Sequence, residues 1–273
     1  MVAGTLYLVG TPIGNLGDMT DRARETLASA DLIAAEDTRR TGRLLKHFGI
    51  AGKTLSFFEG NERERTAELM AKLRRGSDVA LVSDAGMPAL SDPGYRLVRA
   101  CADEGIEVRV VPGPSAALAA LVVSALPTDR VAFEGFLPRK AGERRRRLRS
   151  LADDPRTLVV FEASNRTRLL LEDVVEALGD RRVAVARELT KLHEETIRGR
   201  ASEVLDRVGE GLRGEVVVVI EGNREHEGLD LPALATEARA LADAGMRKRE
   251  AAAEVARRHG ISANAIYRLL TTN

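Results

Sequence analysis

Short runs of mostly apolar residues alternate along the chain with longer segments of helical periodicity, and this alternation constrains the fold more than any other feature. The runs at residues 5–9, 31–35 and 78–82 do not alternate apolar with polar residues. Strands of this kind are buried on both faces, as they are in parallel sheets. Later segments, such as residues 63–74, repeat apolar side chains at helical spacing. The sequence therefore predicts an α/β fold with a mainly parallel sheet that helices cover on both faces.

This rhythm breaks at residues 126–130, which contain Pro127, and we predict a domain boundary there. The later runs at residues 183–187 and 196–198 lie too close together for a crossover helix, so we expect an antiparallel pair in a second, mixed sheet. From residue 229 onward the pattern becomes purely helical. The predicted organisation is an N-terminal α/β domain over residues 1–126, a C-terminal α/β domain over residues 127–226 and a helical tail over residues 227–273.

The helical tail ends in two helical segments, residues 248–258 and 262–270, separated by Gly260. Ser262 or Asn264 would cap the second segment. This spacing resembles a helix-turn-helix, which places its second helix against nucleic acid. A small packing bundle that closes the second domain is the alternative, and both interpretations stay open.

Composition narrows the classes of function. The chain has 42 Lys and Arg against 41 Asp and Glu, a formal net charge of +1, which excludes a globally basic protein but not a local basic patch. A single cysteine, Cys101, excludes an intrachain disulfide framework, and the four histidines show no metal-ligand spacing. There is neither a basic leader nor an apolar window of ~20 residues. We expect a cytoplasmic protein without a membrane span or a bound metal.

Three loops rich in glycine and proline each follow a predicted strand: residues 10–15 (GTPIGN), 83–94 (SDAGMPALSDPG) and 112–116 (PGPSA). Ligands of open α/β sheets bind at the carboxyl ends of strands, where glycines let the backbone approach closely. Three such loops in one sheet indicate a shared ligand site.

The loop at residues 83–94 is the most unusual of the three, because connections from strand to helix commonly take about 2–6 residues. Ser91 and Asp92 fit an ordinary helix start. That explanation leaves residues 84–87 without a structural role, so we expect them to line a pocket.

Two charged segments are further candidates. Glu36, Asp37 and Arg39 follow another predicted strand, where they could act in catalysis or simply begin a helix. Residues 139–149 hold seven basic side chains against one acidic one, and four consecutive arginines cover all sides of a helix. A solvated helix face is the ordinary explanation, but we favour binding to RNA or DNA phosphates. The predicted nucleic-acid-binding residues are Arg139, Lys140, Arg144, Arg145, Arg146, Arg147 and Arg149.

Taken in order, the motifs GTPIGN, EDTR, SDAGMPALSDPG, PGPSA, GFLPRK, FEASNR and ARELTK resemble those of the 16S rRNA cytidine 2′-O-methyltransferase family, within the tetrapyrrole methylase superfamily. The resemblance covers residues 4–222 and, more loosely, the tail. It departs from the family pattern at Ser164 and Asn165, where Pro and His are expected. It implies two α/β domains of the class III methyltransferase type, with S-adenosylmethionine in the cleft between them, and a homodimer.

The resemblance also implies roles for residues. The reaction would transfer a methyl group to the ribose 2′-hydroxyl of a cytidine in the 16S rRNA of the small ribosomal subunit. Glu36, Asp37 or Arg39 would position or deprotonate that hydroxyl, and the basic segment and the tail would hold the RNA backbone. The implied cofactor-binding residues are Gly10, Thr11, Pro12, Asp84, Ala85, Gly86, Met87, Ser115, Ala116, Phe161, Glu162, Ala163 and Leu189.

Two other functions stay open. One is a sister enzyme that methylates a small tetrapyrrole, although a small ring needs no basic segment for phosphates. The other is a regulator without catalytic activity that binds nucleic acid through its helical tail.

Overall fold

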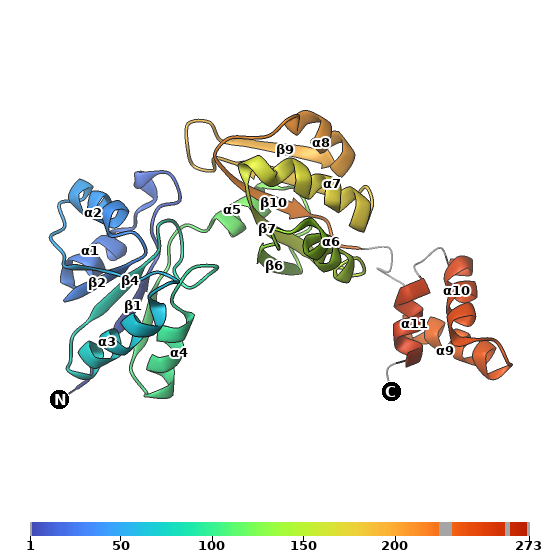
Figure 1. Ribbon diagram of the computed structural model, residues 1–273, viewed down its shortest axis with the longest axis horizontal. Coiled ribbons are helices and arrows are strands. Elements are labelled where there is room, and N and C mark those ends of the chain that lie inside the picture. Colours follow the sequence, from blue (N-terminus) through green and yellow to red (C-terminus); the bar gives the residue numbers. More distant parts are fainter. Residues whose placement is uncertain (1, 224–230, 260–262, 272–273) are drawn as a thin grey trace.

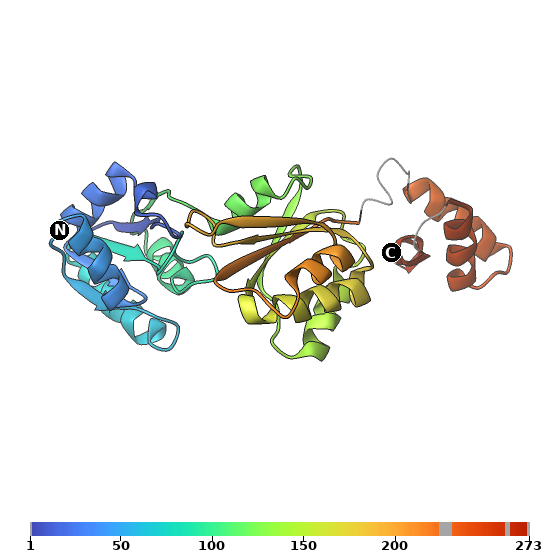
Figure 2. The same cartoon turned by 90° about the horizontal axis from the view of Figure 1, so that it is seen from above.

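The computed structural model describes residues 2–223, 231–259 and 263–271. Along the described chain lie two five-stranded sheets with their covering helices and a separate group of three helices (Figures 1 and 2).

The first sheet was predicted to be mainly parallel and is wholly parallel, with the strand order β3-β2-β4-β1-β5. Its order places β4 in the centre, where all four residues of the strand are buried. The strands are β1 (Leu6–Val9), β2 (Leu32–Ala35), β3 (Thr54–Ser56), β4 (Val79–Val82) and β5 (Val108–Val111).

Helices cover both faces of this sheet, which confirms the prediction from its apolar strands. Leu27 and Leu45 of the helices α1 (Asp21–Ser29) and α2 (Thr38–His47) belong to one apolar cluster with one face. Leu69 and Leu97 of α3 (Glu62–Arg74) and α4 (Tyr95–Asp103) belong to a second cluster with the other face, where Cys101 is also buried. The Thr20 hydroxyl caps α1 by accepting from the Ala23 amide.

The second sheet is mixed, as predicted, with the order β6-β7-β10-β8-β9. β6 and β7 are parallel, while β10 is antiparallel to β7 and β8, and β8 is antiparallel to β9. The strands are β6 (Val131–Phe136), β7 (Thr157–Ala163), β8 (Arg182–Arg187), β9 (Glu195–Arg200) and β10 (Glu215–Ile220).

One face of the second sheet packs against α6 (Ala141–Ser150), α7 (Thr167–Leu178) and α8 (Ala201–Val208). Its other face packs against α5 (Ala116–Val123), which follows the last strand of the first sheet. Ser115 caps α5, since its hydroxyl accepts from the Leu118 amide. The chain therefore passes to the second sheet at α5, ahead of residue 126.

The tail folds into α9 (Leu231–Asp243), α10 (Lys248–His259) and α11 (Ala263–Thr271). Their apolar side chains form a cluster of their own that includes Leu234, Val255 and Ile266. Asn264 lies inside α11 and does not cap it, because the helix already begins at Ala263. Gly260 and Ser262 lie outside the described residues.

Candidate active site

A cavity of about 720 Å³ lies where strand ends of the two sheets come together. The first sheet contributes Glu36 after β2 and the loop after β4. The second contributes the ends of β6, β7 and β8 and the start of β10, which is antiparallel to β7 and β8 and so begins at the same edge. A volume of this size is typical of a small-molecule site.

Ten of the thirteen predicted cofactor-binding residues line this large cavity, although they come from four separate segments. They are Asp84, Ala85, Gly86, Met87, Ser115, Ala116, Phe161, Glu162, Ala163 and Leu189. Glu162 is 4% exposed and forms an ion pair with Arg166. The other three, Gly10, Thr11 and Pro12, do not line this cavity.

The loop after β1 contributes Ile13 to the cavity and also supports the neighbouring loops. The amide of Thr11 donates to the Gly86 carbonyl at 2.9 Å, and the amide of Gly86 donates back to the Thr11 carbonyl at 3.1 Å. A Cβ atom on Gly10 would lie 2.6 Å from the amide nitrogen of Gly113. Glycine at position 10 thus lets the loops after β1 and β5 touch, and together they fix the loop that carries Asp84.

Three carboxylates converge on the first-sheet side of the large cavity. Glu36 accepts from the Asp84 amide at 3.4 Å, and the Asp84 carboxylate accepts from the Asp37 amide at 3.1 Å and from Arg40 at 2.8 Å. Burial raises the pKa of Glu36, and the charge of Asp84 adds to that effect. Burial and then the charge of Glu36 raise the pKa of Asp92 to about 6. Clustered groups with shifted pKa values in a cleft are typical of a functional site.

Of the three predicted catalytic residues, only Glu36 lines the cavity. Asp37 is the N-cap of α2, and its carboxylate accepts from the Arg39 amide at 2.8 Å and pairs with the Arg39 guanidinium at 2.9 Å. These hydrogen bonds hold the pKa of Asp37 well below its usual range. The position of Asp37 and Arg39 matches the alternative explanation, a helix start.

Asp92 is a cavity residue that the sequence analysis explained as part of a helix start, and that explanation was wrong. α4 begins at Tyr95, and its N-cap is Gly94 with a φ of 141°. Ser91 has a φ of 63°, so the chain turns there and carries Asp92 into the cavity. The length of the loop was the available signal, because a helix start does not need twelve residues.

The basic segment at residues 139–149 is largely neutralised by carboxylates, most of them from other elements. Arg145 and Arg149 pair with Glu176 of α7, Arg147 pairs with Glu134 of β6, and Lys140 pairs with Glu143. Within the described part of the chain, only Arg139 and Arg146 of this segment lack a carboxylate partner, and Arg139 lines the large cavity.

The prediction that Arg144 binds nucleic acid is corrected by the structure. Its side chain is 4% exposed and its Nε lies 2.6 Å from the Asp173 carboxylate. Asp173 itself is buried in α7. A guanidinium enclosed in this way cannot reach a phosphate, so Arg144 fastens α6 to α7.

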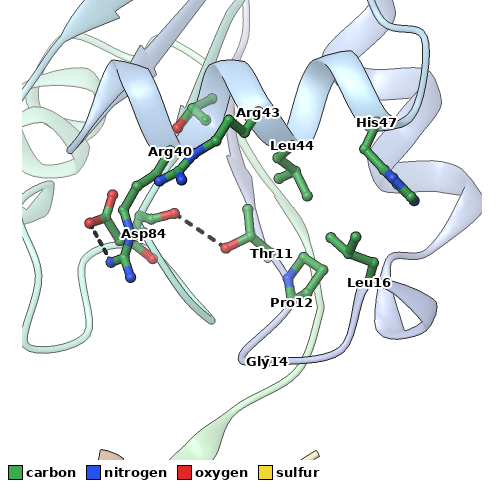
Figure 3. A pocket seen from close by; sticks show the side chains of 11 residues that line it. Thr11, Pro12, Gly14, Leu16, Arg40, Arg43, Leu44, His47 and Asp84 are labelled. Atoms are coloured by element: carbon green, nitrogen blue, oxygen red, sulfur yellow. Dashed lines mark hydrogen bonds and ion pairs between the residues drawn. The ribbon is translucent and has the colours of Figure 1, made fainter. Parts of the chain in front are cut away.

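A smaller cavity of about 270 Å³ lies beside the large one, and the two share Arg40 and Asp84 in their linings. Figure 3 shows side chains of α2 pointing across it toward the loop after β1. Thr11 and Pro12 line this cavity, and the Thr11 hydroxyl donates to the Ser83 carbonyl at 3.2 Å.

Among the described residues, no group of His, Cys, Asp and Glu could hold a metal ion. In the same part of the chain, no helix has both the length and the apolar character needed to cross a membrane.

Comparison with known proteins places these features in context. Residues 5–205 match the family described as Tetrapyrrole (Corrin/Porphyrin) Methylases. The ribosomal RNA small subunit methyltransferase I of Escherichia coli O157:H7 is 48% identical over 270 residues, which cover 97% of this chain and 94% of that protein. The protein of the same name from Thermotoga maritima is 51% identical over 220 residues, which cover 80% of this chain and 99% of that protein.

The fold has relatives among solved structures. The uroporphyrin-III C-methyltransferase of Thermus thermophilus, solved with S-adenosyl homocysteine, superposes with a TM-score of 0.56 at 23% identity, covering 80% of this chain and 97% of that one. At this level of identity the likeness concerns the fold alone.

Proposed function

This chain belongs to the tetrapyrrole (corrin/porphyrin) methylase family, and from that premise we propose that it is an S-adenosylmethionine-dependent methyltransferase of 16S rRNA. The group it methylates is the ribose 2′-hydroxyl of a cytidine in the small ribosomal subunit. The observation that carries the proposal is the large cavity between the sheets, because it gathers the Gly-rich and acidic loops in a chain that is 48% identical to an rRNA methyltransferase.

The residues of the large cavity fit S-adenosylmethionine. The carboxylates of Glu36, Asp84 and Asp92 complement its positive charges, and the Gly86 loop presents backbone groups. Ala186, Leu189 and Val217 offer apolar surface to a flat base. When bound, S-adenosylmethionine supplies a methyl group that its positively charged sulfur activates.

The protein must then align the hydroxyl and help it lose its proton. Glu36 and Asp92 are the candidate proton acceptors, because both line the cavity and both have a raised pKa, which brings them closer to neutral pH. Asp37 and Arg39 support them by fixing the first turn of α2, which also carries Arg40.

We place the enzyme in the cytoplasm, where its RNA substrate is made, and propose that it acts as a homodimer. The exposed Leu118 and Val122 of α5, at 63% and 71%, offer an apolar face to a second copy.

The test is to incubate the protein with S-adenosylmethionine and small ribosomal subunits from cells that lack this modification. Digestion and mass spectrometry should find one added methyl group on the ribose of a cytidine. The double variant Glu36→Gln, Asp92→Asn is the control, and we expect it to bind rRNA but to transfer little methyl.

Two outcomes would favour the alternatives. Calorimetric binding of S-adenosylmethionine, with transfer to a porphyrin precursor but not to free or assembled 16S rRNA, would indicate a tetrapyrrole methyltransferase. Binding of RNA without any binding of S-adenosylmethionine would indicate a regulator without catalytic activity.

A further inference from the structure

The helix α2 carries a concentration of positive charge next to the active site. Its basic residues are Arg39, Arg40, Arg43, Lys46 and His47, and it contains no acidic residue. Arg40, Arg43 and His47 follow one another at helical spacing, and Figure 3 shows them on the side that faces the smaller cavity. The positive charge of α2 is thus directed at a concave surface.

Two of the arginine and lysine side chains of α2 have no carboxylate partner among the residues that the structure describes. Arg39 and Arg40 pair with Asp37 and Asp84. Arg43 and Lys46 are exposed, and neither has a carboxylate partner in the described residues. In the segment 139–149, by contrast, five of the seven basic side chains pair with carboxylates. Unpaired cations give up no ion-pair partner on binding a phosphate, whereas paired ones must first release a carboxylate.

The smaller cavity also offers apolar surface for a base. Pro12 and Leu16 of the loop after β1 face Leu44 of α2 across it, and Leu16 is 42% exposed. An apolar side chain left exposed beside arginines suits an unstacked base, which packs its flat face on apolar or guanidinium groups.

The two cavities meet at one ion pair. Arg40 and Asp84 line both of them, and their side chains are 2.8 Å apart. A polynucleotide lying over α2 would therefore place one nucleotide in the smaller cavity and its neighbour at the mouth of the larger one, in the direction of Glu36.

We propose that the substrate RNA crosses the protein over α2, with the nucleotide next to the methylated one held in the smaller cavity. Arg43 and Lys46 bind its phosphates, and Leu16 and Leu44 pack against its base. The proposal rests on the proposed function, since it names the surface on which that RNA docks. It moves the main RNA contact from the basic segment of α6 to α2.

The experiment compares charge reversals in the full-length protein on small subunits that lack the modification. In Arg43→Glu, Lys46→Glu, we expect the KM for the subunit to rise by about tenfold or more, and the salt dependence of binding to weaken by about one unit of slope per lost phosphate contact. The affinity for S-adenosylmethionine, measured by calorimetry, should stay within about twofold, because neither residue lines the large cavity.

Arg75→Glu is the matched control. Arg75 is an exposed arginine that follows α3, on the other face of the first sheet, and it has no carboxylate partner in the described chain. We expect it to change the KM by less than about twofold. Leu16→Asp tests the base contact separately and should also raise the KM while leaving cofactor affinity unchanged.

Three results would overturn the proposal. The first is an unchanged KM in the α2 variants while wild-type protein methylates the subunit, which rejects the docking surface but keeps the function. The second is a larger effect from Arg139→Glu, Arg146→Glu than from the α2 pair, which places the RNA on α6. The third is a wild-type protein that binds cofactor but never methylates RNA, which rejects both proposals.

Discussion

Asp92 lines the large cavity, and its raised pKa makes the stability of the folded protein depend on pH. Burial beside Glu36 raises its pKa to about 6, against about 3.9 in an unfolded chain. The folded state therefore holds this proton more tightly than the unfolded state. The stabilisation that the protonated form provides is complete below about pH 4 and is lost as the pH rises through about 6.

We therefore expect Asp92→Asn to be stabilised relative to wild type as the pH rises. The gain in the free energy of unfolding should be on the order of 1–2 kcal/mol larger at pH 8 than at pH 4.5. Urea denaturation of both proteins across this pH range measures the difference. Two parallel pH profiles would show that Asp92 ionises as freely in the folded protein as in the unfolded chain.

The buried pair of Arg144 and Asp173 gives a second prediction at this scale. Asp173→Ala leaves the guanidinium of Arg144 buried without its partner, and we expect a loss of about 3–5 kcal/mol in the free energy of unfolding. Glu176→Ala breaks pairs that are about half exposed, so it should cost no more than about 1 kcal/mol. Denaturant titration compares the two, and equal losses would contradict the assignment of Arg144 to the core.

Arg144 and Asp92 show which features of the site could not be predicted from the sequence. The loops that line the cavity could be located from the sequence, because glycine, proline and strand ends are local signals. The burial of Arg144 could not be predicted, because its partner Asp173 lies 29 positions away on another helix. Asp92 was assigned to a helix start because a serine and an aspartate before a proline suit one equally well.

At the scale of the element, α2 contains an interior glycine that lowers the stability of the helix. Gly42 lies inside the helix, and a Cβ atom there would meet no heavy atom within 4 Å. Gly42→Ala should therefore raise the free energy of unfolding by about 0.5–1 kcal/mol, because alanine loses less backbone entropy in a helix. Gly49→Ala is the opposite control, since Gly49 has a φ of 66° and a Cβ atom strains that conformation. Thermal or urea denaturation should move the two variants in opposite directions.

The loop after β1 supplies a prediction on ligand binding. In Gly10→Ala, the new Cβ atom would lie 2.6 Å from the nitrogen and 2.7 Å from the Cα of Gly113, and neither backbone atom can move far. The displaced loops should weaken S-adenosylmethionine binding by about tenfold or more. Gly142→Ala, where nothing lies within 4 Å, serves as the control. Calorimetric affinities that agree for the two variants would refute this role of Gly10.

Most elements could be predicted from their apolar periodicity. Two features could not be, because in each case the same sequence pattern suits two different structural roles. The helix start at Asp37 was weighed equally against a catalytic role, because a capping carboxylate and a catalytic one look alike in sequence. The packing of α5 on the second sheet was not predicted, because its apolar residues suit either sheet.

At the scale of the whole molecule, the cavity and the tail are separable. The lining of the large cavity ends at Val217, and the tail helices bury their apolar side chains mainly against one another. A chain that ends at Asn223 should therefore keep its affinity for S-adenosylmethionine within about threefold. Calorimetry on the shortened protein measures this, and a chain that neither folds nor binds would show that the tail completes the second unit.

The position of α5 has a consequence for how the protein is made. As the chain leaves the ribosome, the first sheet is complete once β5 has emerged, and α5 follows at once. Its packing surface is incomplete until β10 has been synthesised and has inserted between β7 and β8. During that interval the apolar sequence AALAALVV lacks part of its packing surface, so we expect α5 to need protection from aggregation during translation.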